Sequence, residues 1–282
     1  MRRLTSLTVA VALLITVALI TAGCGEKPVT LGIVAVPGID NLAEAVAPIA
    51  QAMAGSLKRE VIPRVYMSYG QLIEGLGNGE CDTAVVSPFA YAVAHDRYGA
   101  NVILSGLRRG ESELRYEFLT RPDTGIVVPI QMAGARVALA AAEGTAEQQY
   151  LLTFLARFGA TAQVTSHADD QAALAALLGR TADIAAVTFG FRDRLRATVP
   201  DIDAQVQVVW ISERIPFEAV AVAKASHVAP TELARAWTEI AGQTAFKSAL
   251  RTLYGIDGLQ AAVDADYGPA REAVAALGIK IR

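Results

Sequence analysis

The sequence contains few of the residues that build metal centres, disulfide frameworks or nucleic-acid-binding surfaces. Its 282 residues include two cysteines and three histidines, and these are scattered along the chain. Zinc and iron–sulfur sites need several such ligands at short spacings, and no carboxylate cluster offers an alternative, so we expect neither metal nor cofactor. Basic residues number 25 against 28 acidic ones. No basic stripe is available to neutralise phosphates, and nucleic acid is not expected as a partner.

Catalytic motifs are also missing from the sequence. Hydrolases and nucleases need a general base beside a nucleophile, or clustered metal-binding carboxylates, and no such spacing is present. The three histidines, His95, His167 and His227, lie far apart, which favours surface or capping roles. The sequence therefore predicts a protein that is not an enzyme.

The N-terminus has the layout of a secretory signal. Arg2 and Arg3 precede an apolar stretch of roughly sixteen residues, 7–22, which is shorter than the roughly twenty that a membrane span needs. Residues 20–24 (ITAGC) resemble a bacterial lipobox, although Thr21 replaces the usual aliphatic residue. We expect residues 1–23 to be a lipoprotein signal peptide, Cys24 to carry the lipid and residues 24–28 to form a tether. Ordinary secretory cleavage or a retained anchor is the alternative.

Apolar runs of strand length alternate with helical patterns along the rest of the chain, which predicts a parallel α/β architecture. Hydroxyl and carboxylate residues mark several helix starts: Ser68 with Gln71, Ser87 before Pro88, and Asp169. The predicted strands are 29–36, 61–67, 83–86, 116–119, 136–139, 163–165, 184–187, 206–211 and 219–223, and the predicted helices are 41–53, 69–76, 89–98, 146–158, 172–178 and most of the tail from Thr231.

Two stretches of the sequence repeat one pattern. Residues 82–87 (DTAVVS) and 183–188 (DIAAVT) each join an aspartate, an apolar strand and a hydroxyl residue, and they lie 101 positions apart. The repeat favours two related lobes, lobe 1 from 29–117 and 217–282 and lobe 2 from 118–216. Each lobe would be a mainly parallel sheet flanked by helices, with a ligand cleft between the lobes and a hinge at the two chain crossings.

Six motifs in order carry a resemblance to a known family. They are 69–76 (YGQLIEGL), 81–84 (CDTA), 87–91 (SPFAY), 182–185 (ADIA), 208–212 (VVWIS) and 215–218 (IPFE). Together they resemble the phosphate/phosphite/phosphonate-binding family of ABC-importer substrate-binding proteins. The resemblance implies a type II periplasmic-binding-protein fold, an extracytoplasmic location on the bacterial cell membrane, and partnership with an ABC permease and its ATPase.

The same resemblance implies where an anion would bind. The family holds its oxyanion at the N-terminus of a second-lobe helix, where free amides and hydroxyl groups favour negative charge. The matching residues here are Glu143, Gly144, Thr145 and Ala146. Only one hydroxyl remains, and Glu143 would repel a phosphonate dianion.

Further cleft residues are implied on both lobes. Tyr69 keeps the family's first-lobe tyrosine, and Ser87 lies at a helix N-terminus in the lobe opposite the anion-binding helix, although capping and packing would explain both equally well. Thr188, Phe189 and Glu218 would add an aromatic ring and a carboxylate suited to a cationic or apolar ligand portion. The alternative is that Phe189 and Phe191 are core residues and Glu218 is a solvated rim residue. Cys81, beside a strand, is expected to be a buried inert thiol.

The function predicted from the sequence is that of a monomeric solute-binding lipoprotein of an ABC importer, with a small oxyanion or organophosphonate as ligand. Two alternatives remain at this point. A membrane-tethered sensor subunit would need the same two lobes without a permease, and an importer component for a partly cationic or apolar solute would use Phe189 and Glu218.

Overall fold

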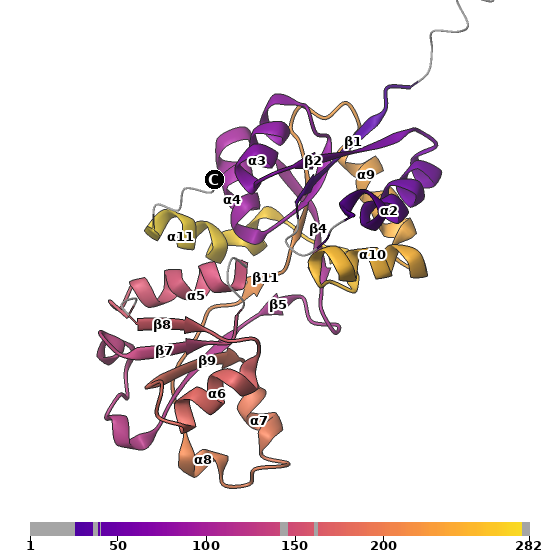
Figure 1. The fold of residues 1–282 in the computed structure, drawn as a ribbon. Helices are drawn as coiled ribbons and strands as arrows, with labels where there is room; N and C mark the ends of the chain where they lie inside the picture. Colours follow the sequence, from indigo (N-terminus) through magenta and orange to yellow (C-terminus); the bar gives the residue numbers. More distant parts are fainter. Residues whose placement is uncertain (1–25, 36–38, 40, 142–145, 161–162, 278–282) are drawn as a thin grey trace, which may run out of the picture.

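The computed structural model describes residues 26–35, 39, 41–141, 146–160 and 163–277. These residues form two lobes, each built on a β-sheet with helices on both faces (Figure 1). Lobe 1 combines the indigo-to-purple first part of the chain with its orange-to-yellow end, and lobe 2 holds the magenta-to-orange middle. The chain enters lobe 2 once and returns once.

The lobe 1 sheet is six-stranded and mixed. Its parallel half, β2–β1–β3, follows from strands joined through helices, whereas the antiparallel half is completed by chain that returns from lobe 2. In the order β13–β4–β12–β3–β1–β2, the strands are β13 (Gly258–Ala261), β4 (Asn101–Leu107), β12 (Ala219–Val222), β3 (Thr83–Val86), β1 (Val29–Val34) and β2 (Val61–Tyr66).

Helices cover both faces of this sheet, which explains why its central strands are apolar throughout. One face packs around buried Trp237 and the other around buried Tyr91. The helices on the first face are α2 (Leu42–Leu57), α9 (Pro230–Ile240) and α10 (Thr244–Tyr254), and those on the second are α3 (Tyr69–Asn78) and α4 (Pro88–Tyr98).

Lobe 2 repeats this plan with five strands. Its parallel part is β9–β7–β8, and β6 and β10 extend it with antiparallel pairing. In the order β10–β6–β9–β7–β8, the strands are β10 (Gln207–Ile211), β6 (Tyr116–Thr120), β9 (Ile184–Thr188), β7 (Arg136–Leu139) and β8 (Gln163–Ser166). Its helical segments are η1 (Pro122–Thr124), η2 (Pro129–Met132), α5 (Ala146–Ala156), α6 (Asp170–Leu178), α7 (Phe191–Leu195) and α8 (Ile202–Gln205).

A two-stranded sheet joins the lobes. The outgoing strand β5 (Glu113–Leu114) pairs antiparallel with the returning strand β11 (Ile215–Pro216), so both crossings lie side by side (Figure 1). The expected boundary between residues 117 and 118 falls inside β6, which belongs to the second sheet. A boundary at β5 fits the sheet pairing better, and the division into lobes remains a prediction.

The end of the chain makes a further contact between the lobes. After η3 (Asp264–Tyr267), helix α11 (Gly268–Leu277) lies between α4 of lobe 1 and α5 of lobe 2. Ala270 and Ala273 of α11 are buried in the same hydrophobic cluster as Phe154 of α5. The small alanine side chains allow these two helices to approach closely.

The predicted α/β class with two helix-flanked sheets is confirmed, but the sheets are mixed rather than mainly parallel. Strand β4 was not predicted, and β13 lies in a tail that was expected to be mostly helical. Both errors concern the antiparallel side of lobe 1. There the chain pairs β4 with two strands that follow it by more than a hundred residues.

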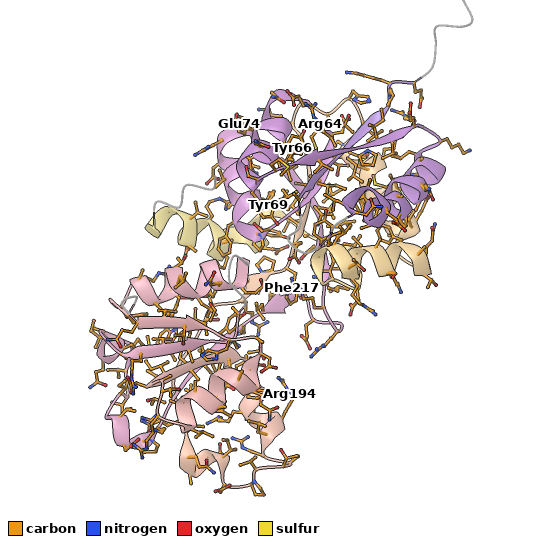
Figure 2. All side chains as sticks on the ribbon, viewed as in Figure 1. Arg64, Tyr66, Tyr69, Glu74, Arg194 and Phe217 are labelled. Atoms are coloured by element: carbon orange, nitrogen blue, oxygen red, sulfur yellow. The ribbon has the colours of Figure 1, made fainter. Side chains whose placement is uncertain are left out.

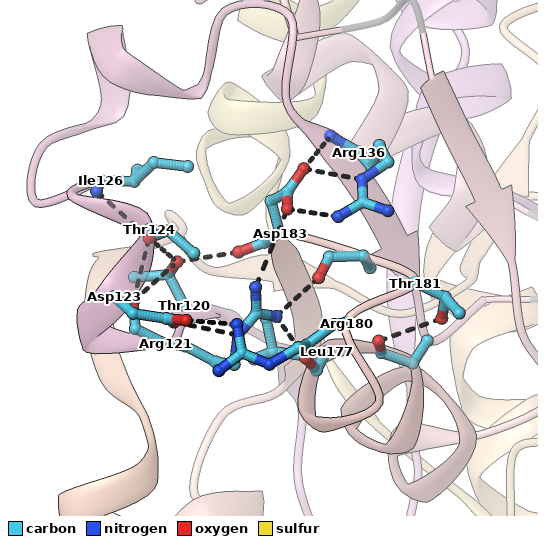
Figure 3. Close-up of polar contacts among 12 residues, drawn as sticks. Thr120, Arg121, Asp123, Thr124, Ile126, Arg136, Leu177, Arg180, Thr181 and Asp183 are labelled. Atoms are coloured by element: carbon cyan, nitrogen blue, oxygen red, sulfur yellow. Dashed lines mark hydrogen bonds and ion pairs between the residues drawn. The ribbon is translucent and has the colours of Figure 1, made fainter.

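The repeated aspartates occupy equivalent places in the two sheets. In lobe 1 the Asp82 carboxylate accepts a hydrogen bond from the backbone N–H of Thr30 at 2.8 Å, and in lobe 2 Asp183 accepts one from that of Arg136 at 3.1 Å. Figure 3 shows how Asp183 also binds the Arg136 guanidinium, with oxygen-to-nitrogen distances of 2.7 and 2.9 Å. Each aspartate thereby ties the start of one parallel strand to the start of its neighbour.

Candidate functional site

Two helix starts on lobe 1 face the junction between the lobes. Ser68 caps α3, accepting a hydrogen bond from the backbone N–H of Gln71 at 3.3 Å, and Ser87 caps α4, accepting one from Ala90 at 3.2 Å. Both caps were predicted from the sequence. In a capping box the Gln71 side chain would accept from the backbone N–H of Ser68. It accepts instead from the N–H of Met67, one residue earlier, at 3.0 Å.

The structure brings Tyr69, Ser87 and Glu218 close together, and their role in ligand binding stays a prediction. Tyr69 hydrogen-bonds to Ser87, and its pKa is raised by burial and by the nearby carboxylates of Glu218 and Glu147. Figure 2 shows Tyr69 in lobe 1, on the side that faces Phe217 at the junction of the lobes. A neutral tyrosine hydroxyl beside a serine hydroxyl provides two hydrogen-bond groups at one place.

Arg108, which the sequence analysis missed, lies at the centre of this group. Its Nη2 donates to Glu218 Oε1 at 2.8 Å and to the backbone oxygen of Tyr254 at 3.2 Å. Its Nη1 donates to Glu147 Oε1 at 2.5 Å. The guanidinium also lies over the Phe217 ring, 4.6 Å from the ring centre. A single cation thus connects two carboxylates, one from each lobe.

Glu218 is buried, which rules out the alternative of a solvated rim residue. Burial raises the pKa of Glu218 to about 7; the Arg108 charge opposes this rise and the Glu147 charge adds to it. Its second oxygen, Oε2, and the Nε of Arg108 are both buried without a hydrogen-bond partner. The group therefore retains an unused acceptor and an unused donor, which is costly in the interior of a protein.

Apolar side chains surround these polar groups and form a cavity between the lobes. Phe89 of α4 stacks against Tyr150 of α5, with ring centres 6.2 Å apart. The cavity is lined by Pro88, Phe89, Arg108, Leu114, Glu147, Tyr150, Ile215, Pro216, Phe217 and Glu218. Its walls come from α4 and α5, and its floor comes from the two crossings of the chain. A few polar groups in such an apolar recess are typical of a small-molecule site.

Other predicted site residues lie away from this cavity. Thr188 is engaged within lobe 2, where its backbone N–H donates to Asp170 at 2.7 Å and its hydroxyl also bonds to Asp170. Phe189 is 45% exposed, which excludes a core role, and the Arg115 guanidinium lies 4.7 Å from its ring centre. Asp169 caps α6 through the N–H of Ala172, as predicted.

The predicted anion site falls at the start of α5. Glu143, Gly144 and Thr145 lie outside the described residues, as does Cys24. Ala146 is the first residue of α5, and Glu147 follows in the first turn. The role of these residues in ligand binding remains a prediction.

The remaining titratable groups do not form a second site in the part of the chain that the structure describes. There, no three His, Cys, Asp or Glu residues gather in a way that could hold a metal ion. Cys81 is fully buried, and burial raises the pKa of its thiol to about 12, which keeps it protonated and unreactive, as predicted. Within the described ranges, no helix is both long enough and apolar enough to span a membrane.

Two sheet-based lobes joined by paired strands, with a cavity at the junction, define a clamshell solute-binding protein. The family described as "ABC transporter, phosphonate, periplasmic substrate-binding protein" matches residues 31–267. The chain belongs to this family, whose members are extracytoplasmic binding proteins and not enzymes. No curated protein sequence matches the chain.

Solved structures share the fold at low sequence identity. A Xanthomonas citri protein bound to ATP is 17% identical with a TM-score of 0.62, over 90% of this chain and 98% of that one. The binding-protein component of an ABC phosphonate transporter from Pseudomonas aeruginosa is 17% identical with a TM-score of 0.53, over 88% and 85%. PhnD1 from Prochlorococcus marinus, in complex with methylphosphonate, is 13% identical with a TM-score of 0.55, over 89% and 98%. These similarities establish a type II periplasmic-binding-protein fold.

Proposed function

We propose that this protein binds a small oxyanion or organophosphonate between its lobes and delivers it to an ABC permease and its ATPase. The observation that carries the proposal is the Arg108 guanidinium in the lining of a cavity between the lobes, with Tyr69, which hydrogen-bonds to Ser87, near the Glu218 carboxylate. Tyr69, Ser87 and Arg108 supply the donors from lobe 1, and α5 begins on the opposite side. Charge-assisted hydrogen bonds from such donors favour an oxyanion.

The binding test uses Tyr69, the hydroxyl donor for which a ligand contact is predicted from the sequence. Calorimetric titration of phosphate, phosphite, methylphosphonate and aminoethylphosphonate identifies the preferred solute. For that solute, Tyr69→Phe should weaken binding by about ten- to a hundredfold, since a hydrogen bond to a charged group is lost. The matched control is Tyr98→Phe, because the Tyr98 hydroxyl bonds to Glu74 on the surface of lobe 1. Equal effects of both substitutions would contradict the placement of the site.

A partly cationic ligand is the second candidate, and one observation favours it. Glu147 and Glu218 share a single cation, Arg108, so the cavity holds more acidic than basic groups. An ammonium group on the ligand would balance this excess. Tighter binding of aminoethylphosphonate than of methylphosphonate would support this candidate, and the reverse order would exclude it.

Attachment to the membrane through Cys24 is also part of the proposal, together with a monomeric state. The supporting feature is the lipobox-like sequence 20–24 (ITAGC). The full-length protein should partition into detergent and incorporate labelled lipid, and Cys24→Ala should abolish both. Lipid incorporation that persists in Cys24→Ala would refute the anchor without affecting the binding proposal.

A further inference from the structure

The Arg108 side chain is held in place by lobe 1 alone. It follows β4, where its backbone N–H donates to the oxygen of Glu111 at 2.9 Å and a return bond closes a tight turn. On the same lobe, Nη2 is bound by Glu218 and by the backbone of Tyr254, and the Phe217 ring supports the guanidinium from one side. These contacts fix the direction of the guanidinium whatever the position of lobe 2.

The remaining end of the guanidinium points at lobe 2. Nη1 donates to Glu147 Oε1 at 2.5 Å, and Glu147 lies in the first turn of α5. The two side chains are only 28% and 21% exposed. An ion pair shielded in this way is stronger than one on the surface. It links the two lobes at the place where the cavity lies between them.

The charges at this point are not balanced. Glu218 and Glu147 both pair with Arg108, so one negative charge is in excess within a largely buried group whenever both carboxyl groups are ionised. If Glu147 is displaced, Arg108 keeps Glu218 as its partner, and Nη1 becomes an oriented donor that faces lobe 2. Burial is the main cause of the raised pKa of Glu218, and the neighbouring Glu147 charge adds to it.

We propose that the carboxylate of Glu147 occupies the place of the ligand's oxyanion on Arg108, and that the ligand binds by displacing it. A carboxylate and a phosphonate present similar oxygen atoms to a guanidinium, which explains how one can substitute for the other. The inference rests on the proposed function, since it assumes that an oxyanion enters this cavity. It adds that Arg108 holds the oxyanion and that Glu147 competes with the ligand for this arginine, which sets the ligand's affinity.

Glu147 also keeps the lobes together before the ligand arrives. The Arg108–Glu147 pair takes the position of a ligand-mediated bridge, so the protein without ligand is closed. Ligand exchange then replaces one interlobe bridge by another. Affinity for oxyanions is reduced by the strength of the internal pair, because the ligand must first break it.

The test removes the charge of Glu147, the internal competitor, without changing the size of its side chain. Glu147→Gln should bind methylphosphonate or inorganic phosphate about ten- to a hundredfold more tightly than the wild type, because a charge-assisted bond no longer competes. Arg108→Gln should lose the same binding. The matched controls are Glu239→Gln and Arg235→Gln, which make the same changes in an ion pair of 2.5 Å on the surface of α9. Neither control should alter the affinity by more than about twofold.

Small-angle scattering of the ligand-free proteins gives a second, independent result. Glu147→Gln should have a larger radius of gyration than the wild type, because the interlobe bridge is missing. If Glu147→Gln leaves the affinity unchanged or weakens it, the proposal is overturned, and weakening would mean that Glu147 contacts a cationic part of the ligand. If none of the oxyanions binds to any variant, the proposed function fails. In that case only the scattering experiment tests the Arg108–Glu147 bridge. Superimposable scattering curves of the wild type and Glu147→Gln would refute it.

Discussion

The buried carboxyl group of Glu218 should make the stability of the fold depend on pH. Burial raises its pKa from the usual value of 4.5 to about 7, whereas the unfolded chain exposes the group to water. Between these two values the folded protein holds a proton that the unfolded chain has released. The contribution of Glu218 to stability is therefore complete below pH 4.5 and is lost as the pH rises towards 7.

The size of the effect follows from the two pKa values. Each tenfold change in proton affinity is worth about 1.36 kcal/mol, so the difference between pKa 4.5 and a pKa of about 7 corresponds to roughly 3 kcal/mol of unfolding free energy. Glu218 is 9% exposed, and solvent screening reduces this figure little. Replacement by glutamine removes the titration and keeps a hydrogen-bonding side chain of similar shape. The difference in unfolding free energy between the wild type and Glu218→Gln should fall by about 3 kcal/mol over the interval.

Urea unfolding of both proteins from about pH 4.5 to about pH 7.5 measures this difference. Glu239→Gln is the control, because hydrogen bonds from Ser56 and Arg235 lower the pKa of Glu239. The contribution of Glu239 to stability is lost only as the pH falls below 4.5, the usual pKa of a glutamate. Between about pH 4.5 and about pH 7.5 the unfolding free energies of Glu239→Gln and the wild type should therefore change with pH in parallel. If the Glu218→Gln curve is also parallel, Glu218 is ionised in the folded protein at pH 5, and the argument from burial is wrong.

Three further predictions concern the framework around the site. Asp183→Asn should lower the unfolding free energy at neutral pH by about 1–3 kcal/mol, since the charged bonds to Arg136 are lost; urea unfolding that matches the wild type would refute this role. Gly75→Ala would place a methyl group against the Tyr66 ring and should cost about 1–3 kcal/mol, and an unchanged melting temperature would show that α3 shifts freely. Trp237→Ala, in the core of lobe 1, should cost about 3–5 kcal/mol, and a smaller loss in urea unfolding would mean that the core collapses onto the gap.

Local signals in the sequence were sufficient to predict where several helices start and where the central strands lie. Ser68, Ser87 and Asp169 cap helices through residues three positions further on, so the whole interaction lies within one short window of sequence. Strands β3 and β9 are apolar runs because they are buried on both faces. Patterns of this kind are present in the sequence before any tertiary contact forms.

The polar group in the cavity could not be predicted in the same way. Arg108 meets Glu147 at a separation of 39 residues and Glu218 at 110, and nothing near Arg108 in the sequence indicates either partner. The resemblance to a family identified Glu218 but not the arginine beside it. Strand β13 was missed for a related reason: it has few strand-forming residues, and it pairs with β4 at the edge of the sheet.

Helix α11 has a consequence for how the protein unfolds. The helix follows the second crossing of the chain by some fifty residues, yet its alanines Ala270 and Ala273 complete the hydrophobic cluster of lobe 2. The part of the lobe 2 core that surrounds Phe154 is therefore completely buried only when α11 has been placed. Melting one lobe exposes apolar surface on the other, so both lobes should share a single cooperative transition. A truncation that removes α11 would destabilise the lobe to which the helix does not belong by sequence.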